Sequence, residues 1–219
     1  MNAQPTPAEA SGSASHYFDA DPDGPSNPTT VELVLPDGTL TLTTDRGVFS
    51  RHAVDVGTKL LLLEGPEQVA DDRHLLDLGC GYGPIACVLA RRNPSATVWA
   101  VDVNARARDL CRSNAEAAGL GNVRVAAPDD VPGDLVLDRL WSNPPIRIGK
   151  AALHQLLLRW LPLLAPDRGS AHLVVQRHLG ADSLQTWLSG QGFPASRRRS
   201  RQAFRLLDVT ARSEPVVER

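Results

Sequence analysis

From residue 74 onward, the chain alternates short apolar runs with longer segments of helical pattern, and no other feature limits its fold as strongly. Strands are expected at 75–78, 97–103, 123–127, 137–142 and 171–176 and around 196–201 and 205–211, and helices at 84–92, 105–118, 150–164 and 182–189. Strands that alternate with helices in this way predict an α/β fold with a doubly wound, mostly parallel sheet. Because ligands of such sheets bind at the carboxyl ends of the strands, we expect the functional residues there.

The first third of the chain has a different pattern and predicts a small cap on this sheet. Two β-rich runs, 31–35 and 39–43, flank an Asp-Gly turn that is typical of a β-hairpin. A short apolar helix is expected at 54–64, and a polar linker follows it. The start of the chain is rich in Pro, Ser, Ala and Gly and cannot bury enough apolar surface to offset the entropy of ordering. We therefore expect a disordered tail over 1–15, an N-terminal cap over 16–72 and the sheet domain over 73–219.

Composition excludes several classes of protein. The chain has 219 residues, of which 42% are hydrophobic, so it can form a substantial core. Its net charge of -2 provides no overall attraction to nucleic acid, although a local basic patch is still allowed. Three cysteines without metal-ligand spacing argue against a disulfide framework and a metal site. We expect no signal peptide, and no apolar run has the roughly 18 residues that a membrane span needs. We expect a cytoplasmic protein without a membrane anchor.

A glycine-rich turn follows the first strand of the sheet. It is Asp77-Leu78-Gly79-Cys80-Gly81-Tyr82-Gly83-Pro84, with a glycine at every second position before a helix. The glycines allow a sharp turn and a close approach of a ligand to the backbone, and the helix start favours a negatively charged group. A dinucleotide fingerprint needs a glycine where this chain has Pro84, which weakens that interpretation. An ordinary strand-to-helix turn is the other alternative, but such turns rarely need three glycines.

Two further strand ends carry polar side chains. Asp102 lies 25 residues after Asp77, where a carboxylate can accept hydrogen bonds from both ribose hydroxyls of NAD or S-adenosylmethionine. The fourth strand ends in Asn143-Pro144-Pro145-Ile146. The Asn143 side-chain carbonyl and the Pro144 backbone carbonyl can accept hydrogen bonds from a planar NH2 group, and the prolines keep the turn rigid. Such a site would aim the nitrogen lone pair at a methyl donor, by positioning and electrostatics rather than a strong base. A Pro-Pro stop after a strand is the structural alternative.

These motifs resemble those of a known enzyme class. The glycine turn and its preceding acid resemble motif I of class I S-adenosylmethionine-dependent methyltransferases. Residues 143–146 resemble the Asn-Pro-Pro-aromatic motif of methyltransferases that act on adenine N6, guanine N2, cytosine N4 or a glutamine amide. From about residue 16 to 211 the chain is similar to the ribosomal small-subunit (16S) rRNA guanine-N2 methyltransferase C family, in its single-domain branch. The stretches that carry this similarity are His16-Tyr17-Phe18, 44–50, 54–62 and 143–150.

The resemblance implies a seven-stranded class I methyltransferase (Rossmann-like) sheet, with 73–219 as the catalytic domain. It implies S-adenosylmethionine as cofactor, ribosomal RNA or the small ribosomal subunit as partner, a monomer and no metal. The expected catalytic residues are Asn143, Pro144, Pro145 and Ile146. The expected cofactor-binding residues are Asp77, Gly79, Cys80, Gly81, Gly83, Asp102, Val103, Asp129, Thr58 and Asn143, with Asp129 at the adenine amino group. The expected substrate-binding residues are Phe49, Lys59, Arg147 and Lys150, joined by Arg198 from a basic run.

Some alternatives stay open. Ile146 stands where the family has an aromatic residue that stacks on the target base. Either another ring compensates, with Tyr17, Phe18 and Phe49 as candidates, or the target is held differently. The basic run Arg197-Arg198-Arg199-Ser200-Arg201 fits either phosphate contacts with RNA or a charged edge strand that resists aggregation. Methylation of a protein glutamine or of adenine N6 is an alternative to guanine N2. A non-catalytic module that binds RNA or a partner is the alternative from another class.

Overall fold

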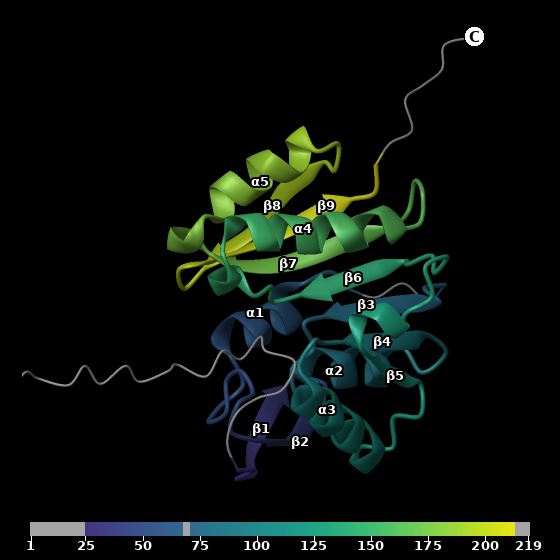
Figure 1. Cartoon of the computed structure of the whole chain (residues 1–219), viewed down its shortest axis with the longest axis vertical. Coiled ribbons are helices and arrows are strands. Elements are labelled where there is room, and N and C mark those ends of the chain that lie inside the picture. The colour runs from purple at the N-terminus through teal and green to yellow at the C-terminus, as the bar shows by residue number, and fades with distance from the viewer. Residues whose placement is uncertain (1–24, 68–70, 213–219) are drawn as a thin grey trace, which may run out of the picture.

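The computed structural model describes residues 25–67 and 71–212 (Figure 1). The predicted tail over 1–15 and the predicted contributions of Tyr17 and Phe18 lie outside the described residues. Among the described residues, no helix is long and apolar enough to cross a membrane.

The main sheet has seven strands in the order β5-β4-β3-β6-β7-β9-β8. Pairing is parallel from β5 to β7 and antiparallel for β7 with β9 and β9 with β8, which confirms the predicted mostly parallel, doubly wound sheet. The strands are β3 (His74–Leu78), β4 (Thr97–Val101), β5 (Val123–Ala126), β6 (Arg139–Ser142), β7 (Ser170–Gln176), β8 (Ala195–Arg201) and β9 (Phe204–Thr210). The helices are α1 (Val56–Glu64), α2 (Pro84–Arg92), α3 (Ala105–Ala117), α4 (Lys150–Trp160) and α5 (Ala181–Gly190).

Two hydrophobic clusters cover the two faces of this sheet. Successive side chains of a strand point to opposite faces, so the neighbours Leu75 and Leu76 are both fully buried but belong to different clusters. One cluster joins the sheet to α1, α2, α3 and the N-terminal hairpin. The other joins it to α4 and α5, which lie beside β7, β8 and β9 in Figure 1. Burial on both faces explains why the strands are short continuous apolar runs rather than alternating ones.

The N-terminal hairpin consists of β1 (Thr29–Leu35) and β2 (Gly38–Thr44), which pair antiparallel as the Asp-Gly turn predicts. Its apolar side is buried in the same cluster as α2 and α3. The Asn114 side chain of α3 bonds both backbone groups of Thr43, with N–O distances of 2.7 and 2.8 Å. At the other end, Asp37 accepts two hydrogen bonds from Arg92, whose guanidinium lowers the pKa of Asp37 to about 2. The hairpin is therefore fixed to the sheet domain at both ends.

Several predicted boundaries differ from those observed by one to four residues, and two of these differences have a clear local cause. β4 ends at Val101 rather than Val103, because Asn104 turns the chain as the N-cap of α3 and accepts the Ala107 N–H at 3.0 Å. α4 ends at Trp160 rather than at residue 164, and a 3-10 turn (Leu161–Leu163) follows. Pro162 lies in that turn and has no N–H with which to continue the helix.

Candidate active site

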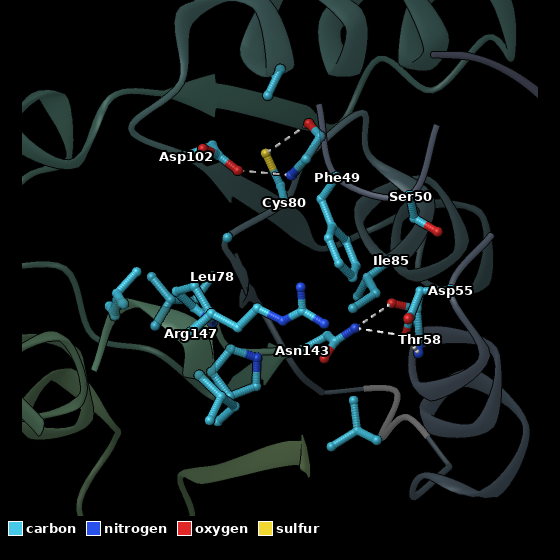
Figure 2. A pocket seen from close by; sticks show the side chains of 18 of the residues that line it. Phe49, Ser50, Asp55, Thr58, Leu78, Cys80, Ile85, Asp102, Asn143 and Arg147 are labelled. Carbon is cyan, nitrogen blue, oxygen red and sulfur yellow. Dashed lines mark hydrogen bonds between the residues drawn. The ribbon is translucent and has the colours of Figure 1, made fainter. Parts of the chain in front are cut away.

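A cavity of about 640 Å³ opens at the carboxyl ends of the central strands (Figure 2). The chain runs from β3 outward to β5 and then returns to β6 on the other side of β3. The loops after β3 and β6 therefore lead away from each other and leave a crevice, as at the switch point of any doubly wound sheet. The segment between β2 and α1, the starts of α1 and β9, the end of β7 and one side of α4 also contribute to the walls.

The glycine turn forms one wall of the cavity. Gly79 and Gly81 have φ angles of 76° and 56°, and a Cβ atom on either would enter open space with no atom within 4 Å. A ligand can therefore approach the backbone closely at these two positions. Cys80 lies between them and also lines the cavity. Gly83 serves packing instead, because it is the N-cap of α2 and a Cβ atom there would meet the Cys111 sulfur at 2.7 Å.

Asp77 lies beneath the turn rather than in the cavity wall. Its side chain is fully buried, and its Oδ2 accepts the Ala86 N–H of α2 at 2.9 Å. Desolvation raises the pKa of Asp77 to about 8, and the nearby Asp102 adds to the rise. The buried carboxyl at this position holds the start of α2 against the end of β3. The structure thus gives the predicted cofactor ligand Asp77 an indirect part, because it supports the turn that faces the cavity.

Asp102 faces the cavity from the end of β4 and also braces the glycine turn. Its Oδ2 accepts the Gly81 N–H at 2.9 Å, as drawn in Figure 2, and its Oδ1 accepts the Asn104 N–H at 2.9 Å. Burial raises the pKa of Asp102, while the backbone N–H groups and Arg108 oppose the rise. Each carboxylate oxygen keeps a second lone pair for a ligand hydroxyl. The neighbouring Val103 lines the cavity and is 43% exposed.

Asn143 projects from the end of β6 toward the cap. Its Nδ2 donates to the Asp55 Oδ2 at 2.8 Å and to the Thr58 Oγ1 at 3.1 Å (Figure 2). Both partners belong to the start of α1, where Asp55 is the N-cap and accepts the Thr58 N–H at 3.0 Å. The amide NH2 is therefore occupied, and the amide oxygen is left for the cavity. Thr58, a predicted cofactor ligand, lines the cavity as a partner of Asn143.

The residues after Asn143 continue the same wall. The Pro144 carbonyl accepts the Ile146 N–H at 2.8 Å, which closes a tight turn and leaves the oxygen one further lone pair. Pro144, Pro145 and Ile146 all line the cavity, and Ile146 also packs against the cluster that includes α4. Arg147 follows on an exposed turn, and its guanidinium extends across the cavity in Figure 2.

Among the other predicted substrate residues, only Phe49 lines the cavity, and this residue is 45% exposed. Lys59 is exposed on α1 and Lys150 is exposed at the start of α4, and neither is in the cavity wall. The structure does not bring the predicted adenine ligand Asp129 to the cavity. Its side chain is 90% exposed and pairs with Arg159 at 2.8 Å, and the neighbouring Pro128 lines the wall instead.

The basic run is β8, which is the edge strand of the sheet as expected. Arg199 and Arg201 pair with Glu64 at the end of α1, at 3.1 and 2.5 Å. Arg198 pairs with Asp208 of β9 at 2.8 Å and is not in the cavity wall. Three of the four arginines therefore have an acidic partner within the described chain, and the two carboxylates, Glu64 and Asp208, balance about half of the charge of this run.

Much of the cavity wall was not predicted from the sequence, including three residues with polar or aromatic side chains: Asp55, Tyr82 and Phe204. Asp55 was expected inside the helix over 54–64 but is the N-cap of α1, and nothing in the sequence indicates its contact with Asn143, 88 positions later. Phe204 reaches the cavity from the start of β9. Its ring packs closely over Gly57, because a Cβ atom on residue 57 would lie only 2.8 Å from the Phe204 Cε1 atom. Tyr82 is 2% exposed, and its hydroxyl has no hydrogen-bond partner among the described residues. Burial and the charge of Asp55 raise the pKa of Tyr82.

A parallel sheet that ends in an antiparallel pair, with the glycine turn and the Asn-Pro-Pro turn on either side of its switch point, is the arrangement of one enzyme class. Fold and site together define a class I S-adenosylmethionine-dependent methyltransferase. Residues 39–195 match the family model of the methyltransferase small domain, and the chain belongs to this family. The predicted enzyme class is therefore confirmed.

Individual relatives agree with this assignment. The protein YbxB of Bacillus subtilis is 36% identical over 171 residues, which cover 77% of this chain and 84% of YbxB. The Ribosomal RNA small subunit methyltransferase C of Pseudomonas aeruginosa is 37% identical over 177 residues, 74% of this chain and 51% of that protein. A solved structure of the T. thermophilus 16S rRNA N2 methyltransferase, in complex with AdoMet and guanosine, superposes with a TM-score of 0.71 at 25% identity. This superposition covers 86% of this chain and 52% of the T. thermophilus chain. The chain therefore spans about half the length of these methyltransferase C relatives.

Proposed function

We propose that this protein transfers a methyl group from S-adenosylmethionine to the exocyclic N2 of a guanine in small-subunit ribosomal RNA. The observation that carries the proposal is the Asn143 side chain, whose NH2 group is held by the cap and whose oxygen is left for the cavity beside the glycine turn. An acceptor at this place suits a target that donates hydrogen bonds, as an amino group does.

The cavity fits the cofactor on the side of the glycine turn. Gly79 and Gly81 leave space that any Cβ atom would fill, and the backbone between them faces that space. Asp102 offers carboxylate lone pairs for the ribose hydroxyls, and Val103 offers an apolar surface for the adenine. When bound, S-adenosylmethionine supplies an electrophilic methyl group.

The remaining wall fits a planar base with an amino group. Asn143 Oδ1 and the free lone pair of the Pro144 carbonyl accept the two amino protons and hold the nitrogen in place. Phe49 offers a ring for stacking, worth about 1–3 kcal/mol per base, and Ile146 covers a face of the base without stacking on it. Rate enhancement then comes from positioning and electrostatics without a strong general base, and the proton that the methylated nitrogen loses passes to solvent.

The RNA target rests on the relatives and on charge near the cavity mouth. The P. aeruginosa relative is named as a methyltransferase of small-subunit ribosomal RNA, and the T. thermophilus structure contains guanosine. Arg147 at the cavity and the exposed Lys59 and Lys150 are suited to phosphate contacts on either side of the target base. The same function implies a cytoplasmic protein. We also propose that the protein is a monomer, in which residues 16–72 act as a cap on the catalytic domain 73–219.

The test uses labelled cofactor with small subunits and naked small-subunit rRNA from undermethylated ribosomes. After digestion to nucleosides, label is expected in N2-methylguanosine. Label in N6-methyladenosine, or in protein glutamine when ribosomal proteins are present, would replace the proposed target with one of the alternatives. Cofactor binding without transfer to any of these acceptors would favour the non-catalytic module.

A further inference from the structure

The contact between Asp55 and Asn143 has a consequence for the chemistry of the site. An asparagine side chain carries an acceptor at one end and a donor at the other, and a half-turn about its last bond exchanges them. With the oxygen toward the cavity, Asn143 accepts from an amino group. With the NH2 toward the cavity, it would face that amino group donor to donor. Something in the fold has to set the orientation.

Asp55 can set it because a carboxylate only accepts hydrogen bonds. The Asp55 Oδ2 lies 2.8 Å from the Asn143 nitrogen, and a flipped amide would bring its oxygen against the carboxylate instead. The second neighbour, Thr58, cannot make this choice, since its hydroxyl is able both to donate and to accept. The orientation of the amide therefore depends on Asp55.

Asp55 is itself held rigidly. It is the N-cap of α1, its Oδ2 accepts the Thr58 N–H at 3.0 Å, and its own carbonyl accepts the Lys59 N–H at 2.9 Å. Its side chain also lines the cavity beside Asn143. Gly57 has no side chain to interfere, and a Cβ atom there would lie 2.9 Å from the Asp55 carboxylate. One carboxylate thus joins the cap to the strand end that carries the Asn-Pro-Pro turn.

We propose that Asp55 is a positioning residue of the methyl-transfer site, which locks the Asn143 amide with its oxygen toward the target. This inference rests on the proposed function for its reaction, an amino-group methylation. It assigns the cap a part in the chemistry, because the residue that selects the orientation of Asn143 comes from the start of α1. Asp55 acts through Asn143 and needs no contact with the target.

A double-mutant cycle tests whether Asp55 acts on the reaction through Asn143. Asp55→Ser keeps an oxygen for the N-cap of α1 but is too short to reach Asn143. We expect it to lower kcat by about tenfold or more through the misplaced acceptor, with cofactor affinity within about twofold of wild type. In an Asn143→Ala background, the same Asp55→Ser change should alter kcat by less than about twofold. An equal loss in both backgrounds would overturn the proposal.

Two further variants separate positioning from a general structural effect. In Asp55→Asn, the backbone Thr58 N–H can only donate and therefore keeps the amide oxygen at the place of Oδ2, where it also accepts from the Asn143 NH2. This variant should recover most of the kcat lost in Asp55→Ser. Asp109→Ser is the matched control, because Asp109 is an exposed residue of α3 that pairs with Arg112 outside the cavity wall. It should leave kcat unchanged. Failure of Asp55→Asn to exceed Asp55→Ser would contradict the role of the acceptor.

A measurement without substrate distinguishes this proposal from the proposed function. In ¹⁵N spectra, the side-chain NH2 signals of Asn143 are identified by their loss in Asn143→Ala. In wild type they should exchange slowly with water, because the NH2 is held by two acceptors. In Asp55→Ser they should shift and exchange several times faster. Unchanged signals would overturn the positioning role even if guanine is methylated, and changed signals would support it whichever acceptor the enzyme uses.

Discussion

Two neighbouring glycines of the same turn are expected to respond to alanine in opposite ways. Gly81 and Gly83 both have positive φ angles, 56° and 92°, so alanine costs about 1–2 kcal/mol of backbone strain at each. Their surroundings differ. A methyl group at 81 enters open space at the cavity, whereas at 83 it lies 2.7 Å from the Cys111 sulfur and 3.3 Å from the Cys111 Cα.

The contact of a methyl group at residue 83 with Cys111 adds an overpacking cost of about 1–3 kcal/mol, because the backbone of α3 has to move. Gly83→Ala should therefore lower the free energy of unfolding by about 2–5 kcal/mol, and Gly81→Ala by about 1–2 kcal/mol. Gly81→Ala should instead weaken cofactor binding by about tenfold or more, equivalent to at least about 1.4 kcal/mol of binding free energy.

Urea unfolding of the cofactor-free protein gives the first quantity, and calorimetric titration with S-adenosylmethionine gives the second. Gly83→Ala is to be titrated at a temperature where it is fully folded. Equal destabilisation of the two variants, together with cofactor affinity that is unchanged in Gly81→Ala, would refute the assignment of Gly81 to the ligand and of Gly83 to packing.

Other residues of the site give separable predictions. Asn143→Ala should keep cofactor affinity within about twofold and lower methyl transfer by about 100-fold; single-turnover assays check this, and unchanged turnover would refute the role of Asn143. Asp102→Ala should weaken cofactor binding by about tenfold or more, since it removes both the proposed ribose contact and the bond to the Gly81 N–H; calorimetry that finds an unaltered dissociation constant would count against it. Burial holds the pKa of Asp77 at about 8, so the folded protein keeps a proton that the unfolded chain releases near pH 4, and stability falls as the pH rises from about 4 to about 8. Asp77→Asn should gain stability relative to wild type across that window in urea titrations, whereas a constant difference would contradict a buried neutral carboxyl.

The parts of the site that follow the strands of a parallel sheet were predictable from the sequence. The glycine turn, Asp102 and Asn143 each come directly after an apolar run, and parallel strands bring their carboxyl ends to one edge. Alternation of strands and helices indicated that topology without any knowledge of contacts. The hairpin was equally clear, because the Asp-Gly turn and its flanking β-rich runs are local signals.

Contacts between distant segments were not predictable in this way. The partners of Asn143 come from the cap, and Arg199 and Arg201 find theirs in Glu64 at the end of α1. A sequence pattern shows the charge of a residue but not the opposite charge that folding places beside it. For the same reason, the family resemblance placed Asp129 at the adenine, while the structure gives its side chain an ion pair with Arg159.

The central claim is the methylation of guanine N2 in small-subunit rRNA, and nucleoside analysis of cellular rRNA tests it most directly. Small-subunit rRNA is purified from cells that lack the gene and from the same cells carrying wild type or Asn143→Ala, and its modified nucleosides are quantified by mass spectrometry. The account predicts that N2-methylguanosine falls in the deletion, returns with wild type and does not return with Asn143→Ala. An unchanged amount of N2-methylguanosine in the deletion, with the loss of a different methylated nucleoside or of none, would contradict it.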